Sequence, residues 1–118
     1  MYAILRGDIY MPIGKAIAQA SHAFLDCYMK ALLIRPEIAK LYLEKSHGTK
    51  VTLKAKSLYQ LLKTHDELVD CGICVVLVTD SNHICLPDFN GSPIITALGI
   101  GPITREQSGR ILKKYNCY

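Results

Sequence analysis

Lys15, Gln19 and His22 are three polar side chains at helical spacing near the start of the chain. Their i, i+4 and i+7 spacing puts an ammonium, an amide and an imidazole on one face of a helix, over about two turns. The residues around them are mostly alanine and isoleucine, so the helix can pack closely against a sheet on another face. Such a row can supply a cation, a hydrogen-bonding group and a base to one cleft, although a polar row is also common on the solvated face of a helix.

Two carboxylates follow segments that have the composition of strands. Asp8 comes after the first apolar segment, and Asp80 comes directly after the apolar run of residues 73–79. Because ligands of α/β sheets bind outside the carboxyl ends of the strands, Asp80 is expected to meet the polar row and pair with His22. A carboxylate fixes the imidazole tautomer and raises its basicity, so His22 could take a proton from water. An aspartate after a strand is also an ordinary turn residue.

A serine nucleophile is not indicated. The chain contains no Gly-x-Ser-x-Gly sequence, and Ser21 points away from the face that carries His22. Activated water is therefore the expected nucleophile.

The elements that must position these residues alternate between helical and extended patterns. Helices are expected over residues 14–34, 37–45, 58–70 and 104–114, and strands over residues 1–6, 49–56, 73–79 and 94–100. Helices between strands favour a three-layer α/β fold. The last two strands are joined without a helix, which favours an antiparallel pair in a mixed sheet.

The composition of three segments predicts their places relative to this sheet. Residues 49–56 alternate apolar side chains with lysines, which is typical of an edge strand. Residues 73–79 are continuously apolar, which predicts a central strand covered on both faces. Residues 81–93 are rich in Asn, Asp, Gly and Pro and are expected to form a long loop with a brief extended piece at 84–86.

Length and composition favour one domain over residues 1–118. Half of the 118 residues are hydrophobic, which is enough for a core without disulfides or a structural metal. No window approaches the roughly 18 uninterrupted apolar residues of a membrane span, and the start of the chain lacks the pattern of a signal peptide. We therefore expect a cytoplasmic protein that does not enter membranes.

The formal net charge of +4 favours a local basic surface that faces an acidic partner. The basic residues that could follow the phosphates of a nucleic acid are Lys45, Lys50, Lys54, Lys56, Lys63, Arg105, Arg110, Lys113 and Lys114. From composition alone, a solvated exterior explains them equally well.

The five cysteines give no clear disulfide pattern, because their number is odd and no secretion signal precedes them. Cys71 and Cys74 form a Cys-x-x-Cys pair, but at the end of a helix, where the dipole does not stabilise a thiolate. Zinc could use Cys71, Cys74, His83 and Cys85 by ligand type, but Cys74 would have to leave an apolar strand. We expect reduced thiols and no metal or cofactor.

Several motifs together resemble a known family. They are Arg6, Asp8 and Met11, then Gly14-Lys15 with Ala18-Gln19-Ala20-Ser21-His22-Ala23, then Asp80, and finally Thr96-Ala97-Leu98-Gly99-Ile100-Gly101-Pro102. In this order and spacing, over nearly the whole chain, they are similar to the archaeal and eukaryotic type of peptidyl-tRNA hydrolase, the second and structurally distinct class of that activity.

The resemblance implies an α/β/α sandwich with a four-stranded mixed sheet. It implies hydrolysis, without metal, of the ester between the carboxyl end of a peptide and the 3′ ribose of tRNA. The residues matching the family's cleft are Lys15, Gln19, His22, Asp80 and Thr96, and those expected to bind the substrate are Arg6, Asp8, Lys50, Lys54 and Lys56.

The cleft residues can divide the reaction between them. His22 would act as the base, with Asp80 orienting it directly or through water. Lys15 would stabilise the oxyanion or a terminal phosphate. Gln19 and Thr96 would position the water and the ester.

One segment departs from the family pattern. Asp80 is followed by Ser81-Asn82, where the family usually has Ala-Gly, and the segment to Thr96 is several residues longer. Such a change could alter substrate preference. It could also mark a non-catalytic relative that binds tRNA or protein, which is the alternative function. The expected partner is peptidyl-tRNA, and the sequence leaves a homodimer open.

Overall fold

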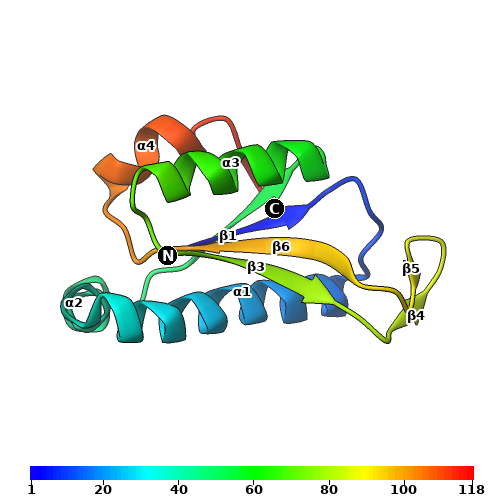
Figure 1. The fold of residues 1–118 in the computed structure, drawn as a ribbon, viewed down its shortest axis with the longest axis horizontal. Coiled ribbons are helices and arrows are strands. Elements are labelled where there is room, and N and C mark those ends of the chain that lie inside the picture. Colours follow the sequence, from blue (N-terminus) through cyan, green and yellow to red (C-terminus); the bar gives the residue numbers. More distant parts are fainter.

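The computed structural model describes residues 1–118 apart from the side chain of Ser46. In these residues, four helices cover the two faces of a mixed five-stranded sheet (Figure 1). The elements in chain order are β1 (Tyr2–Arg6), α1 (Ile13–Ile34), α2 (Pro36–Ser46), β2 (Val51–Ala55), α3 (Leu58–Asp70), β3 (Val75–Asp80), β4 (Ile84–Cys85), β5 (Phe89–Asn90), β6 (Ile94–Ile100), α4 (Arg105–Leu112) and β7 (Asn116–Cys117). In Figure 1, α1 and α2 lie on one side of the sheet, and α3 and α4 on the other. The α/β/α sandwich is confirmed.

The number of strands differs from the expected four. The main sheet gains β7, two residues long, and the segment expected to be a loop folds into a separate hairpin of β4 and β5. Both additions are too short for sequence periodicity to reveal. The extended piece expected at residues 84–86 is confirmed as β4.

The strand order β3-β6-β1-β2-β7 determines where polar residues can meet. β1 pairs with β2 in parallel, whereas β6 runs antiparallel to both β1 and β3. As a result β1, β2 and β3 share one direction, and their carboxyl ends lie along the same edge of the sheet. The site is expected on this edge.

The prediction of a central strand at residues 73–79 is wrong, because β3 lies at the end of the sheet. The strand is apolar on both faces because α1 packs on one and α3 on the other. Composition reports whether faces are covered, and it does not report how many neighbours a strand has in the sheet. The prediction of an edge strand at residues 49–56 is also wrong, because β2 lies between β1 and β7, although only two of its residues pair with the short β7.

Local signals in the sequence account for the ends of the helices. Pro36 occupies the first turn of α2, and the side chain of Ser57 accepts a hydrogen bond from the backbone N–H of Gln60 at the start of α3. Thr104 and Gln107 form a capping box at the start of α4. These caps explain why the expected boundaries of the helices agree closely with the observed ones.

Small side chains let α1 lie close to the sheet. Its buried face consists of Ala16, Gln19, Ala20, Ala23, Cys27 and Ala31. On β6, a Cβ atom added at Gly99 would come within 2.2 Å of the carbonyl oxygen of Ala23. The helix is therefore held at a distance that only a glycine on β6 permits, and this contact sets how near the polar row comes to the strand ends.

We expect Gly99→Ala to destabilise the fold by at least about 1–3 kcal/mol, because the new methyl group overlaps a backbone atom that cannot move aside as a side chain would. Urea unfolding followed by circular dichroism measures this change. Gly109→Ala in α4 is the matched control: its Cβ meets no atom within 4 Å, so helix propensity should stabilise it by about 0.5–1 kcal/mol. Equal stability of the two variants would contradict the close contact.

Candidate active site

Asp80, the last residue of β3, joins two side chains of α1. Its Oδ2 atom lies 2.9 Å from Lys15 Nζ, and its Oδ1 atom accepts a hydrogen bond from Gln19 Nε2 at 3.3 Å. The side chains of Lys15 and Asp80 are only 10% and 16% exposed. The convergence of the helical row with Asp80 is therefore confirmed for Lys15 and Gln19.

Thr96 extends this cluster across β6. Its hydroxyl donates a short hydrogen bond to Gln19 Oε1, with the carbonyl oxygen of Val78 as a second acceptor at 3.3 Å. Both Gln19 and Thr96 are buried, with 4% and 0% of their surface exposed. Because the threonine holds the amide oxygen, the amide NH₂ is turned toward Asp80. Thr96, Gln19, Asp80 and Lys15 thus form one connected chain of hydrogen bonds.

Phe89 is a part of the site that sequence reasoning missed. Its ring, buried in the hairpin segment, lies under the ammonium of Lys15, with Nζ 4.1 Å from the ring centroid. A cation above an aromatic face is stabilised by the ring quadrupole, by more where water is excluded. His83 packs edge-on against the same ring at 6.3 Å. Lys15 is therefore held by a carboxylate and an aromatic ring together.

The hairpin of β4 and β5 is fastened to the rest of the site edge. Asp88 Oδ2 accepts a hydrogen bond of 2.7 Å from the backbone N–H of Tyr10, in the segment after β1. The segment that lengthens the chain after Asp80 is thus folded onto the site. A signal for this hairpin is present in the sequence, since Pro87-Asp88 is a turn-forming pair between apolar residues.

His22 does not form the expected pair with Asp80. The imidazole is exposed, and no hydrogen bond or ion pair joins it to Asp80 in the part of the chain that the structure describes. Lys15 and Gln19 occupy the two carboxylate oxygens, and His22 lies about one turn farther along α1. Of the two ways in which Asp80 was expected to orient His22, directly or through water, the direct contact is absent among the described residues, and the role of His22 stays a prediction. The imidazole shares the helix face of the cluster and remains open to solvent.

Arg6 and Asp8 bind each other at the end of β1. Arg6 Nε and Nη2 donate to the two carboxylate oxygens of Asp8 at 3.0 and 2.7 Å, and Nη1 donates to the carbonyl oxygen of Ile95 at 3.2 Å. The hydrogen bonds from Arg6 lower the pKa of Asp8, while partial burial opposes them. This bidentate pair ties the end of β1 to β6 at the same edge as the cluster.

The three lysines expected to bind substrate lie at two separate places. Lys54 and Lys56 line a hollow of about 310 Å³ with Gly7, Asn116 and Lys114, at the carboxyl end of β2. Lys50 precedes β2 and lies near the opposite edge of the sheet, about 16 Å away along the strand. The structure therefore does not bring all three together.

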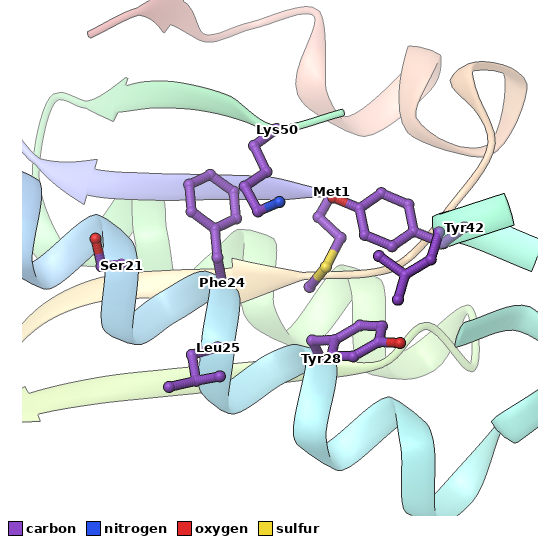
Figure 2. A pocket seen from close by; sticks show the side chains of 8 residues that line it. Met1, Ser21, Phe24, Leu25, Tyr28, Tyr42 and Lys50 are labelled. Atoms are coloured by element: carbon purple, nitrogen blue, oxygen red, sulfur yellow. The ribbon is translucent and has the colours of Figure 1, made fainter. Parts of the chain in front are cut away.

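Lys50 borders a mostly apolar pocket of about 270 Å³ (Figure 2). In Figure 2 the side chains of Met1, Tyr28 and Tyr42 face one another across this pocket, with Phe24 beside Lys50. The Lys50 ammonium donates to the carbonyl oxygen of Gly48 at 2.9 Å. The pocket lies on the flank of α1 that faces away from Asp80, so it is separate from the polar cluster.

The structure places the cysteines neither as a Cys71–Cys74 redox pair nor as a zinc site. Cys74 is buried against Cys27, while Cys71 is exposed. No group of three or more His, Cys, Asp or Glu side chains suited to a metal ion occurs among the described residues. None of the described helices combines the length and the apolar character that crossing a membrane requires.

Comparisons with known proteins give one consistent result. The sequence model of the family described as "Peptidyl-tRNA hydrolase PTH2" matches residues 1–118. The chain is 33% identical over 115 residues to "Probable peptidyl-tRNA hydrolase 2" of Dictyostelium discoideum, covering 98% of this chain and 52% of that protein. It is 35% identical over 108 residues to "Peptidyl-tRNA hydrolase" of Methanothermobacter thermautotrophicus, covering 92% and 89%.

A further relative, "Probable peptidyl-tRNA hydrolase 2" of Schizosaccharomyces pombe, is 28% identical over 104 residues, covering 88% of this chain and 49% of that protein. The chain thus spans about half the length of the two eukaryotic relatives and nearly all of the archaeal one.

Proposed function

Because the chain belongs to the peptidyl-tRNA hydrolase PTH2 family, we propose that it hydrolyses the ester between a peptide, or an N-blocked aminoacyl group, and the 3′ end of tRNA. One observation supports catalysis over binding alone: a lysine held between Asp80 and Phe89 at the strand edge where ligands of α/β sheets bind. An ammonium held in advance at one position is suited to negative charge that develops at that position during a reaction.

Lys15 is assigned to the negative charge that develops on the ester oxygen. An ammonium has three N–H donors, and Asp80 takes one of them, so others are available to the substrate. Because the carboxylate and the ring already fix its position, Lys15 needs little reorganisation during the reaction. Gln19 and Thr96 hold Asp80 in place and act as positioning residues.

His22 is assigned as the base that takes a proton from water. Catalytic hydrogen bonds often form only when the substrate is bound, so an imidazole that bonds to none of the described residues is compatible with this role. Ser21, the neighbouring hydroxyl, donates to the carbonyl oxygen of Ile17 at 2.9 Å and is thereby occupied by the helix backbone. This contact supports water over serine as the nucleophile.

The tRNA is proposed to cross the same edge of the sheet. From Asp80 on β3 to Lys56 after β2 there are three strand spacings, or about 14 Å. The hollow with Lys54 and Lys56 is therefore near enough to bind phosphates close to the 3′ end. Arg6 and Asp8 lie between the two sites and would border the bound strand. Lys50 would meet a different part of the tRNA.

The double variant Lys54→Gln/Lys56→Gln is expected to bind tRNA more weakly, because two cations leave the hollow. The slope of log K against log salt concentration should fall by about 0.7–0.9 for each phosphate that the variant no longer neutralises. Filter binding of tRNA at several salt concentrations measures both effects. Lys40→Gln, at an exposed position of α2, is the matched control. An equal weakening in the control would show that the binding is not local to the hollow.

A direct assay tests the function. The purified chain is mixed with N-acetylated aminoacyl-tRNA, with and without a metal chelator, and free tRNA is measured over time. Release that persists in chelator supports the proposal, and Lys15→Met should slow it by about 10²- to 10³-fold. Binding of tRNA without release would support the alternative, a non-catalytic member of the family.

The proposal includes a homodimer formed through α1. On its outer face, one row has small residues in the first half, Ala18 and Ser21, and large apolar ones in the second, Leu25, Met29 and Leu32. Ile13 and Ile17 are also exposed in the first half. In an antiparallel pairing of two copies about Leu25, Ala18 of one copy faces Leu32 of the other, and Ser21 faces Met29. This complementarity favours a second copy as the partner. Sedimentation equilibrium tests it, because Leu25→Lys should then yield monomers. A wild-type chain that is monomeric at micromolar concentration would exclude it.

A cytoplasmic location is part of the same proposal, because peptidyl-tRNA arises at cytoplasmic ribosomes. Imaging of the tagged protein in its own cell would test this location.

A further inference from the structure

Two cysteines that are far apart in the sequence touch in the core. Cys27 lies in the middle of α1 and Cys74 immediately before β3, and their sulfur atoms are 3.9 Å apart. Cys27 is fully buried and Cys74 is 9% exposed. Cys71 is the other cysteine of the Cys-x-x-Cys motif. It is exposed, and its sulfur contacts no other cysteine among the described residues. The pair formed by the fold is thus a different one from the pair in the motif.

Two cations lie close to Cys74 in the structure. Lys30 Nζ donates to the carbonyl oxygen of Val75 at 2.9 Å, and Arg35 Nη2 donates to that of Gly72 at 3.0 Å. A hydrogen bond from the Cys27 thiol, aided by these two cations, lowers the pKa of Cys74 to about 7 although burial opposes the shift. The same hydrogen bond and burial raise the pKa of Cys27. These opposite shifts favour ionisation of Cys74 over ionisation of Cys27.

A small cleft reaches Cys74 from the surface. It has a volume of about 100 Å³, and its lining includes Arg35, Cys71, Cys74 and Gln107. This volume suits a molecule the size of hydrogen peroxide. Of the two cysteines, Cys74 is among the lining residues of the cleft and Cys27 is not.

We propose that Cys74 and Cys27 are an oxidation site that reacts with small hydroperoxides and closes to a disulfide. The Cys74 thiolate attacks one oxygen of the hydroperoxide, the O–O bond breaks, and the departing oxygen takes a proton to leave as an alcohol, or as water from hydrogen peroxide. Cys74 is then a sulfenic acid. The sulfur of Cys27 attacks it, the S–O bond breaks, and the departing hydroxide takes the proton of Cys27 to leave as water.

The geometry is suited to the second step. The sulfurs are already in contact, so bond formation requires them to close from 3.9 Å to about 2.05 Å through side-chain rotation. No other described cysteine contacts Cys74. The disulfide would join α1 to β3, the two elements that carry Lys15 and Asp80, and would raise the thermal midpoint by restricting the unfolded chain. The oxidation does not depend on the hydrolase activity.

The test uses the reduced wild-type chain in its folded state. It is treated with a few equivalents of hydrogen peroxide, quenched with catalase, alkylated after unfolding and weighed by mass spectrometry. We expect two of the five thiols to escape alkylation, so that the mass reports three added alkyl groups and the loss of about two hydrogen atoms relative to the reduced chain, and we expect a link between the peptides that contain Cys27 and Cys74. The thermal midpoint should rise, and a reductant should reverse every change.

Two variants identify the partners. Cys71→Ser should form the same link at the same rate, because Cys71 is outside the pair. Cys27→Ala should form no disulfide and should accumulate the sulfenic acid of Cys74, which dimedone traps. A link between Cys71 and Cys74, or five thiols left intact after treatment of the folded wild type, would overturn the proposal whether or not either variant folds.

Discussion

A His22→Ala variant is expected to keep its fold and its affinity for tRNA while kcat falls by about 10²- to 10⁴-fold, the usual contribution of a positioned general base. His22 is exposed and has no hydrogen bond within the part of the chain that the structure describes, so its removal should cost little stability. Single-turnover hydrolysis of N-acetylated aminoacyl-tRNA at saturating enzyme measures the effect, and urea unfolding of the same sample measures stability.

His65→Ala is the matched control for this experiment. His65 lies on α3, on the other side of the sheet, where it bonds to Asp66 at 2.9 Å. Its removal should leave kcat unchanged. If His22→Ala also keeps a rate within about threefold of the wild type, another group activates the water and His22 is not the base.

Lys15→Met is expected to lower both stability and kcat. The charge of Asp80 would lose its ion pair in a largely buried place, which costs a few kcal/mol, less than the 3–5 kcal/mol typical of fully buried pairs. The rate should fall by about 10²- to 10³-fold, as after removal of one oxyanion donor. Urea unfolding and single-turnover rates give the two quantities separately.

The double variant Lys15→Met/Asp80→Asn separates structure from catalysis. It removes both charges, and the amide of residue 80 can still accept a hydrogen bond from Gln19. Most of the stability should therefore return, while kcat stays low. Recovery of the rate together with stability would mean that the pair supports the fold only. Lys114→Met, which breaks an exposed pair with Glu67, should change stability by no more than about 1 kcal/mol.

The polar cluster could be foreseen because two independent regularities meet there. Helical spacing puts Lys15 and Gln19 on one face of α1, and the apolar run before Asp80 puts that carboxylate at the end of a strand. Ligand sites of α/β sheets lie at such ends, so the meeting of the two follows from the order of the elements alone. Thr96 entered through the resemblance to the family, because one buried threonine has no periodic signal.

Contacts that depend on side-chain competition could not be foreseen. Gln19 and His22 are about one helical turn apart, and both could bond to Asp80. Lys15 and Gln19 donate to its two carboxylate oxygens, and the sequence does not show which side chains will do so. Phe89 could not be assigned to Lys15 because its segment was expected to be a loop. Cys27 and Cys74 are separated by 47 residues, and only the packing of α1 on β3 brings them together.

The first turn of α1 has a consequence for the field at the site. The helix begins after Pro12 without a side-chain cap, contains no acidic residue in its first turn, and has Lys15 as its third residue. Its first backbone N–H groups therefore have no carbonyl within the helix, and the dipole presents roughly half a positive charge at this end. Asp80 neutralises the ammonium but leaves this partial charge in place. The cluster is thus close to neutral, yet it lies in a positive potential that favours any step in which negative charge builds up on the substrate.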